Sequence, residues 1–181
     1  MKHTRLLVAL FAVYLVLLVW VVLWRLELPY VGGVLREIAL VPFATGDESA
    51  KSPFELVFNF VLFIPFGLYL GLLAPSWRWW KVGIVIAGAS LVLEIAQYVL
   101  AVGISDITDL LLNTAGGLAG FGLLTLARRR LEDRAVAVMT SVSSIGTVVA
   151  VVAVVAVGVF LVSPIHYAPP RGGDLPIVST P

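Results

Sequence analysis

The sequence predicts an all-α fold: a polytopic membrane bundle of five transmembrane helices, with the N-terminus inside and the C-terminus outside (N-in/C-out). Of the 181 residues, 60% are hydrophobic and 13% are charged, and the mean hydropathy is +1.05. Soluble domains carry roughly a quarter charged residues. Five apolar stretches each approach the ~20 residues that an α-helix needs to cross a bilayer. Lipid must therefore cover much of the surface.

The composition also excludes several kinds of site. The chain has no cysteine, which removes disulfides, thiol nucleophiles and thiolate metal sites. Its two histidines, His3 and His166, lie near the termini, so a histidine zinc site is not expected. The basic residues flank apolar runs instead of forming a stripe, so we expect no nucleic-acid partner. Nothing in the sequence requires a cofactor.

Leu6–Trp24 is the first predicted span, because it is uninterrupted apolar sequence of transmembrane length. Lys2 and Arg5 precede it, as in a signal peptide, but the run is longer than a signal-peptide core. The residues that follow also lack a small-residue cleavage site, so we interpret the run as a retained helix. Four further apolar runs predict the other spans: Phe54–Ala74, Val82–Val102, Asp106–Ala127 and Val142–Val162.

The segments between and after these spans complete the predicted organisation. Residues 25–53 contain several prolines and glycines, which favour irregular structure with one short interfacial helix. The chain divides into a four-helix membrane domain over 1–127, a basic cytoplasmic loop over 128–141, a fifth helix over 142–162 and an extracellular tail over 163–181. The tail is rich in proline and is predicted to be disordered. The fifth helix, rich in valine and alanine, is interpreted as an anchor and not as part of a site.

The distribution of lysine and arginine predicts the orientation, because cytoplasmic loops carry an excess of both. With the N-terminus inside, eight basic residues are cytoplasmic: Lys2, Arg5, Arg78, Lys81, Arg128, Arg129, Arg130 and Arg134. Four lie outside: Arg25, Arg36, Lys51 and Arg171. This asymmetry is the basis for the N-in prediction. The arginines between the fourth and fifth helices are expected to attract anionic lipid without specificity.

Polar residues converge near the outer ends of three predicted helices. The third and fourth helices form a hairpin around Val102–Ser105, and residues equally far from this turn should lie at equal depth. Glu94 is then level with Asn113, about 10 Å below the helix ends. The second helix runs inward from its start, which brings Asn59 to nearly the same depth. One carboxyl and two carboxamides are therefore expected at one level of the bundle.

Helical periodicity also places the polar residues on shared faces. The third and fourth helices each carry one polar stripe: Glu94, Gln97 and Tyr98 on the former, and Asp106, Asp109 and Asn113 on the latter. The second stripe continues into Gly116 and Gly120, and small residues at this spacing let a neighbouring backbone approach closely. Together with Asn59, the two stripes are the predicted ligand-binding residues.

Several of these residues also have a purely structural interpretation. Asp106 is a good helix N-cap, with a second acid three residues later. Asn59 and Asn113 are equally well explained by hydrogen bonds between helices, and Tyr98 by anchoring at the membrane interface. Glu94 is different, because a carboxyl buried among aliphatic side chains is costly where a leucine would serve packing better. We interpret Glu94 as functional.

The polar residues fall within four blocks of distinctive order and spacing: Leu40–Phe43, Asn59–Gly67, Glu94–Gln97 and Ser105–Gly120. The last block has the pattern D-x-x-D-x-x-x-N-x-x-G-x-x-x-G. In these blocks the chain resembles the VanZ-like family, from about Leu6 to Ala127. The resemblance implies a multi-pass protein of the bacterial plasma membrane, linked to reduced susceptibility to teicoplanin-like glycopeptide antibiotics. It also implies that the motif residues form a functional site.

Two functions are compatible with this site, and whether the chain is an enzyme stays open. The first is binding or alteration of a cell-envelope component at the outer leaflet, with membrane lipids and a lipid-linked cell-wall precursor or a glycopeptide as partners. The alternative is a membrane-embedded enzyme acting on a lipid-linked substrate. Glu94 and Asp109 would then supply acid–base catalysis, or Asp106 and Asp109 would hold a divalent metal ion. A proton pathway is disfavoured, because the predicted inner halves carry almost nothing ionisable.

Overall fold

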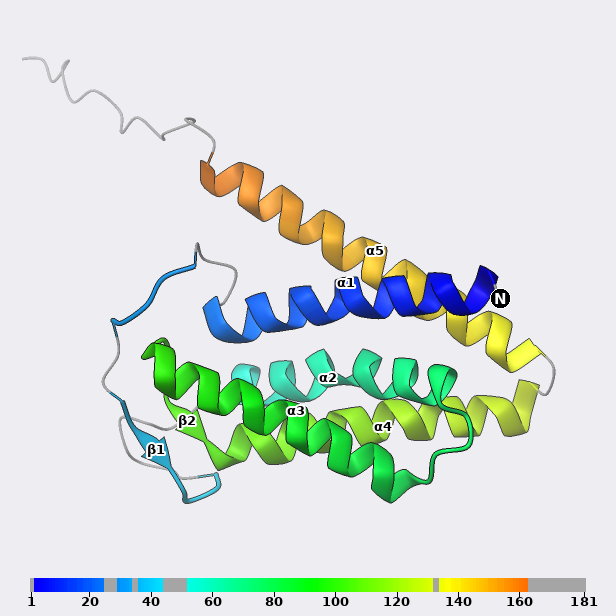
Figure 1. The fold of residues 1–181 in the computed structure, drawn as a ribbon, viewed down its shortest axis with the longest axis horizontal. Helices are drawn as coiled ribbons and strands as arrows, with labels where there is room; N and C mark the ends of the chain where they lie inside the picture. The colour runs from blue at the N-terminus through cyan, green and yellow to red at the C-terminus, as the bar shows by residue number, and fades with distance from the viewer. Residues whose placement is uncertain (1, 25–28, 34–35, 44–51, 132–133, 163–181) are drawn as a thin grey trace, which may run out of the picture.

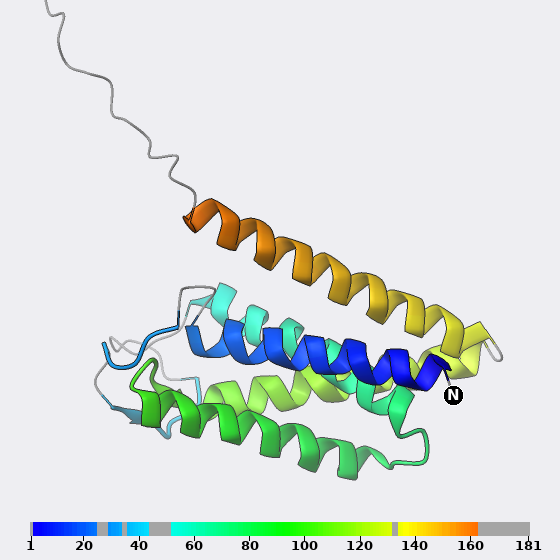
Figure 2. The same cartoon turned by 45° about the horizontal axis from the view of Figure 1, so that its top comes forward.

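The structure, a computed structural model, describes residues 2–24, 29–33, 36–43, 52–131 and 134–162. In chain order, the elements within these residues are α1 (Lys2–Trp24), β1 (Ile38–Ala39), α2 (Pro53–Leu73), α3 (Trp79–Leu100), β2 (Ser105–Asp106), α4 (Ile107–Leu131) and α5 (Ala135–Val162) (Figure 1). Helices α1 to α4 form a bundle of alternating direction. Helix α5 crosses this bundle at an angle (Figure 2).

All five helices in the described part of the chain are long and apolar enough to cross a membrane, which confirms the predicted all-α membrane bundle. Large apolar side chains point outward along them, including Val16 (68% exposed), Ile84 (63%) and Leu126 (52%). Exposed apolar surface of this extent needs lipid around it. We call the end where α1 and α3 finish the outer end, and the opposite end the inner end. These names follow the predicted orientation, which stays a prediction.

The connection between α4 and α5 differs from the predicted one. Helix α4 continues to Leu131 and α5 already begins at Ala135, so most of the predicted loop over 128–141 is helical. Arginine is a good helix former, and basic side chains in the last turn oppose the negative end of the helix dipole, so α4 continues beyond its apolar stretch. The predicted disordered tail, residues 163–181, lies outside the described residues.

Helices α2 and α4 pack through a glycine seam, formed by Gly67 on α2 and by Gly116 and Gly120 on α4. A Cβ added at Gly116 would overlap the carbonyl oxygen of Phe60, and one added at Gly120 would overlap that of Ile64. A Cβ at Gly67 would overlap the backbone of α4. The prediction that Gly116 and Gly120 permit close approach is confirmed, and the neighbouring backbone is that of α2.

An aromatic core joins α1 to α2 next to this seam. The ring of Phe11 lies 5.4 Å from that of Phe66, edge to face, and 5.3 Å from that of Tyr69. Tyr14 is buried, and its hydroxyl donates to the carbonyl oxygen of Leu62 at 2.7 Å. A hydroxyl in the hydrocarbon region needs such a partner, because no water is there to supply one.

Helix α5 is attached to the bundle through a polar contact near the inner end. The Tyr69 hydroxyl lies 2.7 Å from Thr147 Oγ1 and donates to the carbonyl oxygen of Ser143 at 3.1 Å. All three side chains are buried. Towards its C-terminus α5 diverges from the other helices, as both views show (Figures 1 and 2). The contact therefore links the fifth helix to the bundle near its start.

The segment between α1 and α2 lies against the outer ends of α3 and α4. Strand β1 pairs in parallel with β2, with Ile38 opposite Ser105. The guanidinium of Arg36 donates to the carbonyl oxygens of Tyr98 and Val99, each at 3.3 Å. These carbonyls belong to the last turn of α3, where regular helical partners run out; that of Tyr98 also accepts from the N–H of Ala101 at 3.2 Å.

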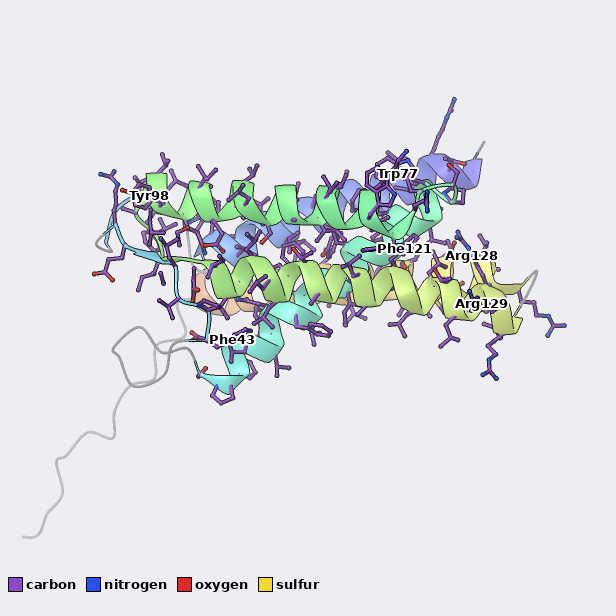
Figure 3. The ribbon with its side chains drawn as sticks, turned by 90° about the horizontal axis from the view of Figure 1, so that it is seen from below. Phe43, Trp77, Tyr98, Phe121, Arg128 and Arg129 are labelled. Carbon is purple, nitrogen blue, oxygen red and sulfur yellow. The ribbon has the colours of Figure 1, made fainter. Side chains whose placement is uncertain are left out.

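The same segment also reaches the start of α4. The backbone N–H of Phe43 donates to Thr108 Oγ1 at 3.1 Å, and Figure 3 places Phe43 near the first turn of α4. The short interfacial helix predicted in this segment is absent from residues 29–33 and 36–43. The remaining positions of the segment lie outside the described residues. Parallel pairing with β2 holds residues 38–39 extended, which a helix would not permit.

Candidate functional site

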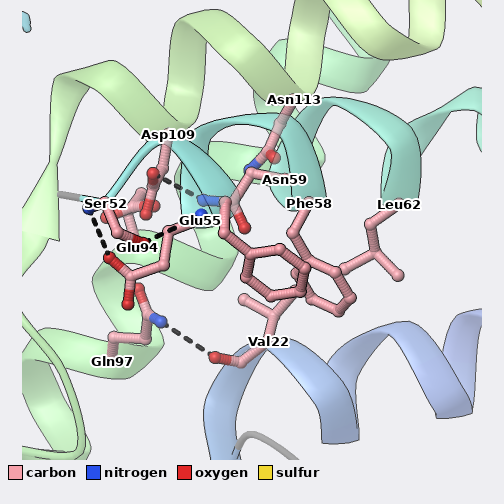
Figure 4. A pocket seen from close by; sticks show the side chains of 11 residues that line it. Val22, Ser52, Glu55, Phe58, Asn59, Leu62, Glu94, Gln97, Asp109 and Asn113 are labelled. Atoms are coloured by element: carbon pink, nitrogen blue, oxygen red, sulfur yellow. Dashed lines mark hydrogen bonds between the residues drawn. The ribbon is translucent and has the colours of Figure 1, made fainter.

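A cavity of about 470 Å³ lies at the outer end, between α1, α2, α3 and α4. We call it the outer cavity, and its lining residues are Val22, Ser52, Phe54, Glu55, Phe58, Asn59, Leu62, Glu94, Gln97, Asp109 and Asn113. Figure 4 shows polar groups from α2, α3 and α4 meeting on one side, with Phe58, Leu62 and Val22 on the other. The cavity therefore has a polar wall and an apolar wall.

The first turn of α2 contributes Ser52 and Glu55 through a capping box. Ser52 Oγ accepts from the N–H of Glu55 at 3.3 Å, and the Glu55 carboxylate accepts from the N–H of Ser52 at 3.2 Å. This arrangement satisfies two backbone donors at the helix start. One turn further along, Asn59 Nδ2 donates to Asp109 Oδ1 at 2.6 Å. Helix α2 is thereby tied to α4 across the cavity wall.

Helix α3 contributes Glu94 and Gln97. The Glu94 side chain is only 4% exposed, and its carboxylate accepts from the backbone N–H of Asp106 at 2.8 Å. Gln97 Nε2 donates to the carbonyl oxygen of Val22, near the end of α1, at 2.9 Å. Gln97 therefore binds the backbone of α1 through its amide nitrogen.

Asp106 acts as the N-cap of α4. Its Oδ1 accepts from the N–H of Thr108 at 2.7 Å, which is the bond that an N-cap aspartate makes to the first helical turn. The structural interpretation of Asp106 is thus confirmed, and Asp106 is not among the residues lining the outer cavity. Tyr98 is also not among them, and it lies at the outer end of α3 (Figure 3).

The hairpin between α3 and α4 is offset from the predicted register. Asn113 Nδ2 donates to Ser90 Oγ at 2.9 Å, one turn below Glu94, and Glu94 instead bonds to Asp106. The prediction that Glu94 lies level with Asn113 was therefore wrong by about one helical turn. The cause is the connection: β2 runs extended beside α3 and advances about 3.3 Å per residue, against about 1.5 Å in a helix, so α4 starts deeper.

Two side-chain oxygens of the cavity wall have no hydrogen-bond partner among the described residues, Asn113 Oδ1 and Gln97 Oε1. The Asn113 side chain is only 3% exposed. In either orientation of its amide, one polar end bonds to Ser90 and the other has no partner within the described chain. A buried polar atom without a partner costs about 1–3 kcal/mol. Both residues line the outer cavity, so its wall retains unused hydrogen-bonding capacity.

Five of the seven predicted ligand-binding residues line the outer cavity: Asn59, Glu94, Gln97, Asp109 and Asn113. Sequence reasoning missed Ser52, Glu55 and Ser90. The first two follow the S-x-x-E pattern of a capping box, which is readable from sequence and locates the start of α2 next to the cavity. Ser90 has no such signal, because its role depends on the register of the α3–α4 hairpin.

The chemistry available in the outer cavity is that of carboxylates and carboxamides. Glu55, Glu94 and Asp109 line it together with three side-chain amides, and no lysine, arginine or histidine among the described residues does so. Within the described residues, no three His, Cys, Asp or Glu side chains lie close enough to hold a metal ion. A cation at Asp106 and Asp109 would therefore need further ligands from water or from a bound lipid. The site is best suited to a group that donates hydrogen bonds.

Comparison with known proteins gives two matches. The family model described as VanZ/LLP1 matches residues 11–128, a range that contains every residue lining the outer cavity. The chain is 35% identical over 129 residues to Protein VanZ of Enterococcus faecium, which covers 69% of this chain and 77% of that protein. No solved structure matches the chain.

Proposed function

The chain belongs to the VanZ/LLP1 family of multi-pass membrane proteins, and we propose that it binds a lipid-linked component of the cell envelope in the outer cavity. By binding or altering this component, the protein lowers susceptibility to teicoplanin-type glycopeptides. The observation that carries the proposal is the pair of amide oxygens that have no partner among the described residues and lie on residues lining the same cavity as buried carboxylates. A fold that needed only helix packing would place apolar side chains there.

The polar wall favours a ligand that donates hydrogen bonds, such as an amine or a hydroxyl-bearing sugar. Asn113 Oδ1 and Gln97 Oε1 are acceptors, and the carboxylates of Glu94 and Asp109 add acceptor oxygens and negative charge. A volume of about 470 Å³ is within the range of small-molecule sites. A phosphate or other anion would face these carboxylates at close range, which is unfavourable in a medium of low dielectric constant.

The apolar wall favours a ligand with a lipid tail. Phe54 and Phe58 line the cavity and are also 75% and 41% exposed on the outside of α2. They therefore connect the cavity to the surface that lipid covers. A polar head in the cavity and a hydrocarbon chain along these rings would satisfy both walls at once.

Glu94→Gln and Asp109→Asn test whether the function requires these two acids to ionise. Each amide keeps an acceptor oxygen for the observed bond, from the Asp106 N–H or from Asn59 Nδ2, so folding should be preserved. We expect normal protein levels and melting temperature but loss of the teicoplanin-tolerance phenotype. Removing one partner of a buried charged pair typically costs 2 kcal/mol or more, which is roughly a thirtyfold loss of ligand affinity.

Asp106→Asn is the matched control, because asparagine caps a helix as well as aspartate and this residue does not line the outer cavity. Its effect should be milder. If both Glu94→Gln and Asp109→Asn keep full activity at normal protein levels, the polar residues of the outer cavity serve only helix packing. If these variants still bind an envelope lipid but leave it chemically unchanged relative to wild type, the acid–base enzyme is the better description.

The proposal also requires the outer cavity to face outward. Because the chain has no cysteine, single cysteines report the topology without a background. A membrane-impermeant maleimide applied to intact cells should label Val31→Cys, which is 75% exposed at the outer end, and should not label Arg134→Cys at the inner end. The opposite labelling would place the cavity on the cytoplasmic side and end its connection with an extracellular antibiotic.

A further inference from the structure

A second hollow lies at the inner end, between α3 and α4 and the connection that precedes α3. It has a volume of about 670 Å³, and we call it the inner groove. Its lining residues are Pro75, Trp77, Trp79, Leu118, Phe121, Gly122, Thr125, Leu126, Arg128 and Arg129. Figure 3 shows Phe121 between α3 and α4, with Trp77 on one side and Arg128 and Arg129 on the other.

The rim of the inner groove is basic and aromatic. Arg128 and Arg129 supply guanidinium groups, and none of the described residues that line the groove is acidic. Arg128 Nη2 donates to the carbonyl oxygen of Gly71 at 2.8 Å, which holds this side chain in place and leaves its other N–H groups for the groove. Trp77 and Trp79 are 37% and 67% exposed, and tryptophan is typical of the headgroup level of a membrane.

The floor of the inner groove is apolar and open towards lipid. Leu118, Phe121 and Leu126 lie along it in successive turns of α4. A Cβ added at Gly122 would meet no atom within 4 Å, so this glycine leaves free space instead of accommodating a neighbouring helix. The glycines of the seam on the opposite face of α4 are different, because each of them contacts a backbone.

We propose that the inner groove is a specific binding site for an anionic phospholipid. The phosphate binds the guanidinium groups of Arg128 and Arg129 at the level of the tryptophans, and one acyl chain lies along the floor past Gly122. Arginine suits this role because its planar fork matches phosphate oxygens. The apolar floor selects a lipid over a soluble anion. The proposal does not depend on the function of the outer cavity.

A specific site and a general attraction for anionic lipid make different predictions for neighbouring arginines. Arg129 lines the inner groove, whereas Arg130 is exposed on the same last turn of α4 and does not line it. Arg129→Gln and Arg130→Gln therefore change the charge equally but only one changes the site. Arg128 is unsuitable for this comparison, because its substitution would also free the Gly71 carbonyl oxygen.

The measurement is the dissociation constant of phosphatidylglycerol for the purified, delipidated full chain in neutral detergent, by native mass spectrometry, with phosphatidylcholine as reference. The wild type should prefer phosphatidylglycerol. Arg129→Gln should weaken its binding about tenfold, because a hydrogen bond to a charged group contributes about 1.5 kcal/mol. Arg130→Gln should stay within about twofold of wild type, because a neutral micelle has no surface potential to reduce. Equal losses, or no preference for phosphatidylglycerol, would overturn the proposal.

The floor is tested by Gly122→Leu, which fills the free space without changing charge. This variant should also weaken phosphatidylglycerol binding, whereas Gly88→Leu, at another open position on α3 that does not line the inner groove, should not. Both variants should keep the wild-type melting temperature before lipid is added, which separates loss of the site from loss of the fold. Unchanged phosphatidylglycerol binding by Gly122→Leu would show that no acyl chain lies along the floor of the inner groove.

Discussion

The two halves of the α2–α4 pair differ in how the same two helices meet. In the inner half, glycines on each helix contact the backbone of the other, and Phe63 beside them has no exposed surface. In the outer half, α2 and α4 are linked by the Asn59–Asp109 bond and border a cavity of about 470 Å³. Along the glycine seam no space is left between α2 and α4, while the outer half leaves space and polar atoms without a partner among the described residues.

This difference separates residues that hold the bundle together from residues that serve a site. Between helices in lipid, close packing of small residues stabilises association, and an average side-chain hydrogen bond adds under about 1 kcal/mol. The glycine seam therefore accounts for assembly without help from the polar cluster. The buried carboxyls and amides of the outer half then need another explanation, and ligand binding supplies one. Three substitutions test the comparison, from the largest expected effect to the smallest.

Gly120→Ala should be the most damaging, because its Cβ would overlap the carbonyl oxygen of Ile64 and a backbone atom cannot move aside. We expect a loss of at least about 2 kcal/mol in the free energy of unfolding, measured by thermal unfolding in detergent. Gly122→Ala, on the same helix but with nothing within 4 Å of its Cβ, should be neutral or stabilising by up to about 1 kcal/mol. Equal stability of the two variants would show that the seam is not closely packed.

Asn113→Leu should separate stability from function in the outer half. The change removes the bond to Ser90 but also removes an amide end that has no partner in the described part of the chain, so the free energy of unfolding should stay within about 1 kcal/mol of wild type. Antibiotic tolerance should be lost, because the acceptor is gone. A large drop in melting temperature with tolerance retained would make Asn113 a structural residue and remove the contrast between the two halves.

Tyr69→Phe should have the smallest effect, because it removes only the hydroxyl that links α2 to α5. We expect a loss of about 1 kcal/mol, and Thr147→Val should lose a similar amount because it breaks the same contact. The double variant should lose less than the sum of the two, which a double-mutant cycle would detect. Strict additivity would mean that the two side chains act separately. Tolerance should be unaffected, since neither residue lines the outer cavity.

Much of this organisation was predictable from local sequence. The five spans follow from the length of apolar runs, and the polar stripes on α3 and α4 follow from helical periodicity. Four residues of these stripes line one cavity together with Asn59 of α2. The role of Gly116 and Gly120 was also predictable, because small residues at that spacing lie on one helix face. Apolar length and periodicity are properties of a short stretch of chain, so they do not depend on the segments that the stretch packs against.

Only the tertiary structure decided which polar groups meet. The extended residues of β2 lower the start of α4, which pairs Glu94 with the Asp106 N–H and Asn113 with Ser90, and pairing with β1 holds β2 in place. With this offset, Asn113 Oδ1 has no partner among the residues that the structure describes. The engagement of α5 through Tyr69 likewise has no sequence signal. Register and docking depend on contacts between distant segments, and a shift of one helical turn exchanges every partner while leaving the periodicity unchanged.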